Sequence, residues 1–227
     1  HEGWGIVSTP AGRIYFTDIP RNIVWCIDRD GSVTMALQET HTHALVTIGD
    51  GSVYGTHVNA TEPIRSAWRI DAEGRTHTLV SPARDLPLGF QSFLIDTDGT
   101  MYSAGGAPGQ GGVLLRRGPD GVIERVAAGF KSIDGMAWTP DRAIFLTDGI
   151  HLKRVTLDGT IETLGGGPIT QTRWGAALMG VTTDGSGGAF VADFVGGRVL
   201  DVGRRSGVAI EYVSNFPWSP TGVAPEA

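Results

Sequence analysis

Hydrophobic and polar positions along this chain alternate over short segments separated by Gly, Asp and Ser, a pattern typical of β-strands and tight turns. Apolar runs such as Ile14-Tyr15-Phe16, Ile144-Phe145-Leu146 and Ala189-Phe190-Val191 have the length of strands packed between sheets. No segment has a convincing helical period. The pattern therefore predicts an all-β protein.

Turn residues show that the strands belong to a repeated unit. The turn after the first strand of each copy lies at Ala11-Gly12, Asp50-Gly51, Asp98-Gly99, Asp141-Arg142 and Gly187-Gly188. A second turn ends a later strand of each copy at Asp30-Gly31, Glu73-Gly74, Asp120-Gly121, Asp158-Gly159 and Ser206-Gly207. Strand repeats of roughly 40–50 residues are the signature of a β-propeller.

The repeat predicts one domain over residues 1–227 with five complete four-stranded blades. Their expected bounds are about 1–37, 38–80, 88–128, 131–165 and 174–214. In the first blade we expect strands at 5–8, 13–17, 24–28 and 32–36. The final segment, 218–227, has the pattern of the innermost strand of a sixth blade.

Three explanations for this final segment remain open. The chain is a truncated or incompletely represented six-bladed protein, a five-bladed ring with a tail, or a propeller that a second chain closes. We favour a six-bladed parent architecture, because an open edge strand invites pairing and aggregation.

Composition narrows the classes of function. The chain has 227 residues, of which 34 are glycines, as a fold with many tight turns requires. Its net charge of −6 argues against a nucleic-acid surface, because phosphate binding needs a basic patch. No apolar run approaches the ~18 residues that cross a membrane, which predicts a soluble protein. The single cysteine, Cys26, lies in an apolar strand and is expected to be a packed thiol. A start at His1 without a leader fits a processed secreted or periplasmic protein or a trimmed chain, and the compartment stays open.

Equivalent positions in the first strands predict which side chains face the propeller axis. Counting back from the first turn of each blade selects His43, Gln91, Asp134 and Met179, with Thr221 in the final segment and Glu2 slightly out of phase. Carboxylates and amides that converge from different blades can wrap calcium, which takes six to eight oxygen ligands without strict geometry. The axial end of the first strands is therefore the predicted site.

Three motifs give the chain a resemblance to a known family. Glu2-Gly3-Trp4, residues 13–19 and the segment from Ile133 to Asp141 are similar to the regucalcin/gluconolactonase family of six-bladed propellers. The Asp-Gly turns also resemble those of NHL-repeat proteins. The resemblance implies a lactonase with a divalent metal, calcium in the first instance, at the axis.

The resemblance also implies roles for individual residues. Glu2 stands for the first metal ligand of the family, and Asp134 replaces the Asn that serves as the second. Gln91 replaces the Asn that binds substrate. Met179 stands where the family has an Asp that is both ligand and presumed base, and a thioether is a poor partner for calcium. The resemblance therefore supports the fold more strongly than the activity.

Histidines of the second blade suggest further chemistry. His41 and His43 are expected on one face of a strand because side chains alternate with a period of two, and His57 ends the neighbouring strand. With Glu2 or Asp134 they could bind zinc, iron or copper. Alternatively, His43 could act as a general base on a lactone or ester. The default alternative is that they are structural and bond backbone groups.

Two functional hypotheses follow. The first is a metal-dependent hydrolase that opens a lactone or ester, with His43 and Asp134 catalytic and with Glu2 and Asp134 holding the metal. In this hypothesis Gln91, His57 and Trp174 contact a sugar-like or lactone ligand. The second is a non-catalytic NHL-like propeller that binds a ligand or a protein through its loop face.

A repeated acidic position has a structural explanation instead. Asp18, Asp148 and Asp193 recur at the ends of second strands, where carboxylates commonly accept hydrogen bonds from backbone N–H groups. We expect these three residues to cap loops.

Overall fold

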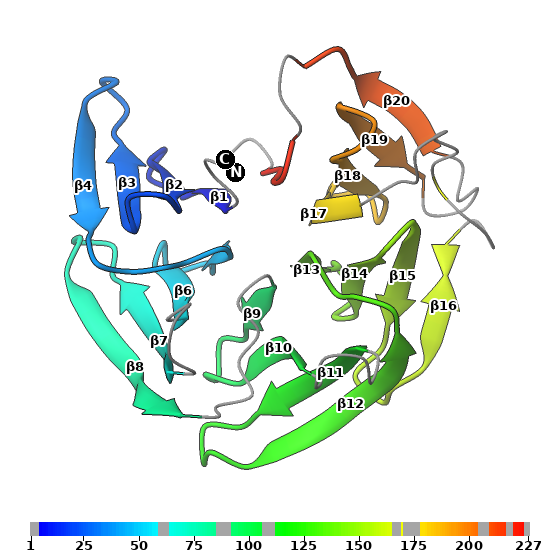
Figure 1. Ribbon diagram of the computed structural model, residues 1–227, viewed down its shortest axis with the longest axis horizontal. Coiled ribbons are helices and arrows are strands. Elements are labelled where there is room, and N and C mark those ends of the chain that lie inside the picture. The colour runs from blue at the N-terminus through cyan, green and yellow to red at the C-terminus, as the bar shows by residue number, and fades with distance from the viewer. Residues whose placement is uncertain are drawn as a thin grey trace. The chain divides into compact units, whose positions relative to one another are not determined.

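The computed structural model is a β-propeller of five four-stranded antiparallel sheets, whose strands are labelled in Figure 1. It describes residues 5–58, 64–84, 92–105, 112–164, 169, 178–203, 209–216 and 220–224. The predicted all-β propeller with five complete blades is confirmed. Within the described ranges, no helix is long and apolar enough to span a membrane.

Each blade contains four strands that are consecutive in sequence. The first blade comprises β1 (Ile6–Ser8), β2 (Ile14–Asp18), β3 (Ile23–Ile27) and β4 (Val33–Leu37). The second comprises β5 (Leu45–Thr47), β6 (Val53–Val58), β7 (Ile64–Ile70) and β8 (Thr76–Arg84). The third comprises β9 (Phe93–Ile95), β10 (Met101–Gly105), β11 (Gly112–Arg117) and β12 (Ile123–Phe130). The fourth comprises β13 (Met136–Trp138), β14 (Ile144–Asp148), β15 (His151–Val155) and β16 (Ile161–Thr163), and the fifth β17 (Leu178–Thr183), β18 (Ala189–Asp193), β19 (Arg198–Val202) and β20 (Ala209–Val213).

Neighbouring strands pair in sequence order, so each blade is a meander. In the first blade Phe16 of β2 lies opposite Ile6 of β1 on one side and Trp25 of β3 on the other. The strands of this blade match their predicted bounds to within one residue. Short strands of this kind need a turn about every ten residues, which explains the high glycine content.

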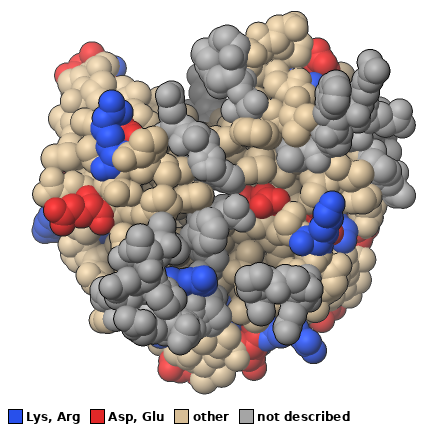
Figure 2. Space-filling view, in the orientation of Figure 1, with Lys and Arg blue, Asp and Glu red and all other residues tan. Residues whose placement is uncertain are grey.

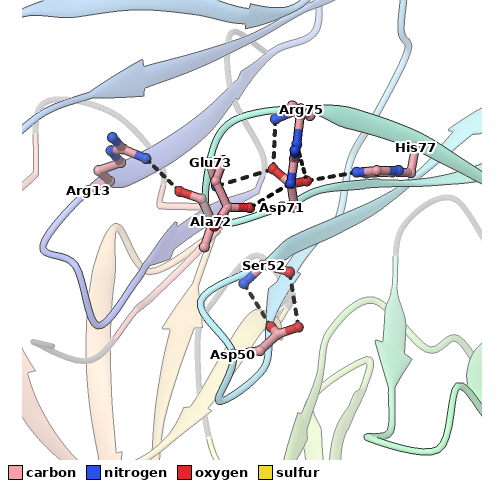
Figure 3. A network of polar contacts seen from close by, with 8 residues as sticks. All are labelled: Arg13, Asp50, Ser52, Asp71, Ala72, Glu73, Arg75 and His77. Carbon is pink, nitrogen blue, oxygen red and sulfur yellow. Dashed lines mark hydrogen bonds and ion pairs between the residues drawn. The ribbon is translucent and has the colours of Figure 1, made fainter.

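Left-handed turn residues fix where the strands end. Gly51 and Gly99 have φ values of 79° and 87°, which a residue without Cβ adopts at little cost. In the fourth blade Arg142 takes this place with a φ of 65°. The preceding aspartate reinforces the turn: Ser52 N–H donates to Asp50 Oδ1 at 2.8 Å (Figure 3).

A polar network at a later turn of the second blade is also structural (Figure 3). The buried carboxylate of Asp71 accepts hydrogen bonds from the backbone N–H of Arg75 at 2.8 Å and from its Nε at 2.9 Å. Nε2 of His77 lies 2.8 Å from the same carboxylate. The contact with His77, followed by those with Arg75, lowers the pKa of Asp71 against the opposing effect of burial.

The contacts divide the chain into two compact units, of residues 1–104 with 116–123 and 226–227, and of residues 105–115 with 124–225. The first unit has a core between the sheets of its first two blades, made by Val7, Tyr15, Val24, Cys26, Leu45, Val53, Trp68 and Ile70. The core of the second unit is made by Phe145, Leu152, Leu164, Leu178, Val181, Ala189, Val191, Leu200 and Val202. The expected packing of Cys26 is confirmed, and its burial raises the pKa of the thiol.

Glycines let the backbone segments of the second unit approach closely. A Cβ on Gly135 would overlap the carbonyl oxygen of Met179, and a Cβ on Gly180 would lie 2.8 Å from the carbonyl oxygen of Thr221. Gly180 N–H also donates to Thr221 O at 3.0 Å. The described part of the final segment, 220–224, contains no strand.

Among the described residues of the face drawn in Figure 2, charged side chains form no large single-sign patch. Lys and Arg lie there in small separate groups, with Asp and Glu between them. This distribution agrees with the modest net charge of −6.

Candidate functional site

In the first unit, two histidines meet immediately before β5. Nε2 of His41 lies 2.9 Å from Nε2 of His43, and the ring centroids are 4.9 Å apart. The predicted placement of both rings on one side of the segment is confirmed. The segment itself precedes β5 instead of forming part of a strand, so its shape depends on side-chain contacts more than on sheet pairing.

Asn22 determines which nitrogen of His41 carries a proton. Asn22 lies in the turn between β2 and β3 with a φ of 56°, and its Oδ1 is 3.1 Å from Nδ1 of His41. An amide oxygen accepts only, so Nδ1 of neutral His41 is the donor and its Nε2 carries the lone pair. The ring of His43 then donates its Nε2–H to His41. Asn22, His41 and His43 thus form one hydrogen-bonded chain.

His57 lies in β6, the strand that pairs with β5, and it fixes the backbone of the segment that carries His41 and His43. Its Nδ1 accepts the backbone N–H of His41 at 2.9 Å, so Nδ1 is unprotonated and Nε2 carries the ring proton. Thr42 adds a second attachment, because its hydroxyl donates to the carbonyl oxygen of Thr56 at 2.9 Å. His57 therefore has a positioning role in the described structure, and its contact with a substrate stays a prediction.

Burial keeps His43 and His57 uncharged. The side chain of His43 is buried, and this burial, with a smaller effect of His41, lowers its pKa to about 4. Burial and then His41 also lower the pKa of His57. At neutral pH His43 and His57 are therefore neutral imidazoles.

In the second unit, Asp134 lies just before β13. Ser132 donates its hydroxyl hydrogen to Asp134 Oδ2 at 2.8 Å. Burial raises the pKa of Asp134, with Ser132 opposing and the charge of Asp148 adding to the increase. Among the described residues Asp134 forms no ion pair, so its carboxylate is a candidate to receive a cation.

Asp148, at the end of β14, holds the segment that carries Asp134. Its Oδ1 accepts the backbone N–H groups of Lys131 at 2.6 Å and Ser132 at 3.0 Å. Its other oxygen forms an ion pair with Lys153 Nζ at 2.6 Å. The predicted capping role is confirmed for Asp148, as it is for Asp18, which accepts Arg21 N–H, and for Asp193, which accepts Gly196 N–H.

The two clusters have the same design in different residues. His41, His43 and His57 occupy the repeat positions that Ser132, Asp134 and Asp148 occupy in the fourth blade. In each cluster the first residue contacts the side chain two positions further on: His41 contacts His43, and Ser132 contacts Asp134. A residue at the end of the second strand of the blade accepts the backbone N–H of the first residue. His57 accepts that of His41, and Asp148 accepts that of Ser132.

Sequence reasoning selected His43 and Asp134 but missed the residues that support them. Ser132 could have been found, because it precedes Asp134 by the same two positions by which His41 precedes His43. Asn22 and Lys153 carry no comparable signal, since their contacts arise from a left-handed turn and from strand register.

Several predicted site residues lie outside the described ranges: Glu2, Gln91 and Trp174. Met179 lies within the described ranges, next to a register shift in β17. Its backbone carbonyl oxygen accepts a hydrogen bond from the Thr147 hydroxyl at 2.8 Å. No group of three or more His, Cys, Asp and Glu in the described structure is arranged to hold a metal ion. Asp134 therefore fits one ligand of a hard cation, and Met179 supplies no carboxylate.

The fold defines a β-propeller, and the sequence comparison specifies the family. Residues 3–223 match the SMP-30/Gluconolactonase/LRE-like region, so the chain belongs to this family. No curated protein sequence matches the chain significantly.

Solved structures with the same fold include several enzymes. A gluconolactonase from Xanthomonas campestris is 15% identical, with a TM-score of 0.74 over 98% of this chain and 79% of that one. Virginiamycin B lyase from Staphylococcus aureus is 19% identical, with a TM-score of 0.65 over 100% and 75%. The PQQ-bound aldose sugar dehydrogenase from Streptomyces coelicolor is 17% identical, with a TM-score of 0.73 over 100% and 86%. At these identities the likeness shows the fold alone.

Proposed function

We propose that this protein is a lactonase-type hydrolase that opens a lactone or ester of a small, sugar-like molecule. Membership of the SMP-30/gluconolactonase family supports this reaction class. The observation that carries the proposal is the buried His43, which is neutral at pH 7 and hydrogen-bonded to a second, less buried imidazole at 2.9 Å.

The histidine pair provides a route for the proton of the attacking water. Nδ1 of His43 is buried, so this route requires that substrate binding gives the attacking water access to this atom. His43 then takes the proton on Nδ1 and passes its Nε2 proton to Nε2 of His41. The positive charge then lies on His41, where Nδ1–H already faces Asn22 Oδ1. Moving the charge away from the buried ring explains how a group with a low pKa can act as a general base.

Asp134 is the proposed ligand of a hard divalent cation, with Glu2 as the second ligand. Ser132 occupies one carboxylate oxygen of Asp134, which leaves the other for the cation. Such a cation, when bound, polarises the carbonyl that water attacks. Gln91, His57 and Trp174 are the proposed contacts to the substrate, which needs neither a nucleic-acid nor a membrane surface.

Lactone opening can be followed directly, because each turnover releases one proton when the hydroxy acid ionises. We would compare wild type, His43→Gln and Asp134→Asn on a series of sugar lactones at pH 7, with calcium and with a chelator. We expect His43→Gln to lower kcat by about 10²–10⁴-fold, the usual contribution of a general base. His151→Gln is the control, since His151 begins β15 and has no part in the proposed chemistry. No turnover of any lactone by the wild type would overturn the proposal.

One observation favours the second candidate, a non-catalytic propeller of the NHL type. Met179 stands where the resemblance expects a catalytic Asp, and its strand is irregular at this point. In that case the wild type would bind lactones or sugars in a thermal-shift assay without turnover.

A further inference from the structure

Half of the histidines of this chain gather at one set of repeat positions. The sequence contains six histidines, and three of them are His41, His43 and His57. In the fourth blade the same positions are filled by Ser132, Asp134 and Asp148, which make the equivalent backbone and side-chain contacts. An imidazole is therefore not required to fold this segment, and its use at all three positions of the second blade needs another explanation.

We propose that His41 and His43 form a binding site for a late transition-metal ion, with Cu(II) bound most tightly, through their two Nε2 atoms. The residues of this site belong to the first unit, whereas Asp134, the proposed ligand of a hard cation, belongs to the second. It requires no rearrangement of the backbone, because the two nitrogens already face each other.

The ligand chemistry favours a tetragonal metal. The two hydrogen-bonded nitrogens lie 2.9 Å apart, close enough to be ligands of one ion once the proton between them is displaced. Tetragonal coordination with nitrogen and oxygen ligands is the preference of Cu(II) and Ni(II), and the general order of affinity also places Cu(II) first.

The surroundings of His41 are those of a metal-binding imidazole. Metal-bound histidines usually donate the proton of their other ring nitrogen to an oxygen, which fixes the ring and increases its basicity. Nδ1 of His41 has such a partner in Asn22 Oδ1 at 3.1 Å. His57 Nδ1 holds the backbone N–H of His41, which restricts the segment between the two rings. Both rings bind as neutral imidazoles, so His43 moves its single ring proton from Nε2 to Nδ1.

The donor set also predicts which ions are rejected. Both ligands are imidazole nitrogens, which suit copper, nickel and zinc, whereas calcium and magnesium prefer oxygen. A bound ion would occupy the nitrogen through which His43 passes its proton to His41, and would inhibit hydrolysis. This consequence rests on the proposed function, whereas the metal site itself does not.

The test is a titration of the untagged, metal-stripped full chain with Cu(II), read by electron paramagnetic resonance and d–d absorption. All proteins carry His1→Ala, so that this imidazole, which lies outside the described residues, adds no Cu(II) ligand. We expect one Cu(II) with nitrogen hyperfine coupling from two imidazoles, weaker binding of Ni(II) and Zn(II), and no competition by calcium. His41→Ala should weaken binding at least tenfold, and Asn22→Ala about tenfold as expected for a supporting contact. His77→Ala is the matched control and should bind normally.

Unchanged Cu(II) affinity in His41→Ala, or a spectrum with fewer than two coordinated nitrogens in the parent, would overturn the site. Because His43 is buried, His43→Gln is tested only together with a check of its folding. If His43→Gln misfolds, the result for His41→Ala decides. A wild-type protein that binds Cu(II) but turns over no lactone would count against the proposed function alone. Turnover without Cu(II) binding would count against the metal site alone.

Discussion

The backbone N–H of His41 donates to Nδ1 of His57 at 2.9 Å, in the place where Ser132 N–H donates to Asp148 at 3.0 Å. An imidazole and a carboxylate thus do the same structural work in two blades of one propeller. In each blade this bond sets the position of the residue two places further on, which is His43 in one and Asp134 in the other. Candidate chemistry is therefore placed by the loop caps that the repeat already needs.

The cap at His57 predicts a difference between two substitutions. His57→Ala leaves the N–H of His41 without its acceptor and should lower the free energy of unfolding by about 1–2 kcal/mol. His57→Asn offers a side-chain oxygen as acceptor and should retain most of the stability. Urea denaturation of both variants measures the difference, and equal losses would show that the hydrogen bond contributes nothing.

The ion pair between Asp148 and Lys153 predicts acid sensitivity. Burial acts to raise the pKa of Asp148, but hydrogen bonds from Lys153 and from the N–H groups of Ser132 and Lys131 outweigh it, and the pKa is lowered. A lowered pKa stabilises the fold above the unfolded value of about 3.9, and this stability is lost as the pH falls through the folded pKa. Lys153→Met should cost about 3 kcal/mol at pH 7, because it leaves a buried charge unpaired.

The cost of Lys153→Met should shrink as the pH falls and Asp148 becomes protonated in the variant. Chemical denaturation of wild type and variant at several pH values measures this. A cost that does not depend on pH would mean that lost packing, and not the charge, is responsible.

Close backbone approach predicts that Gly135 tolerates no side chain. The Cβ of alanine would meet the carbonyl oxygen of Met179, which belongs to the backbone and cannot move aside easily. We expect Gly135→Ala to destabilise the protein by about 2 kcal/mol. Gly49→Ala is the control, since a Cβ there meets no atom within 4 Å. Similar melting temperatures for the two variants would contradict this account of the inner strands.

A cation at Asp134 predicts stabilisation that depends on one carboxylate. A metal that binds only the folded protein raises its melting temperature. Calcium should therefore stabilise metal-stripped wild type, and Asp134→Asn should abolish the shift while keeping the hydrogen bond from Ser132. A full calcium shift in Asp134→Asn would remove Asp134 from the proposed ligand set.

The sequence was sufficient for the blades because their strands and turns are local. The Asp50-Gly51 turn, for example, is fixed by a positive φ and by an aspartate two residues before the N–H that it accepts. Equivalent repeat positions also selected His43 and Asp134. The contact of His41 with Asn22 spans 19 residues and depends on a left-handed turn, so no local sequence pattern predicts it.

The pairing of Lys153 with Asp148 was equally beyond a local pattern. It depends on the register between β14 and β15, in which Lys153 lies opposite Leu146 and not opposite Asp148 itself. The backbone role of Met179 follows from the irregular register of β17, which no local pattern predicts.

The central claim is that the buried, neutral His43 activates water for lactone opening. The most direct measurement is the rate of proton release from a sugar lactone at pH 7 by wild type and by folded His43→Gln at equal concentration. The account predicts turnover by the wild type and a kcat at least about a hundredfold lower in the variant. Equal turnover by the two proteins would contradict it.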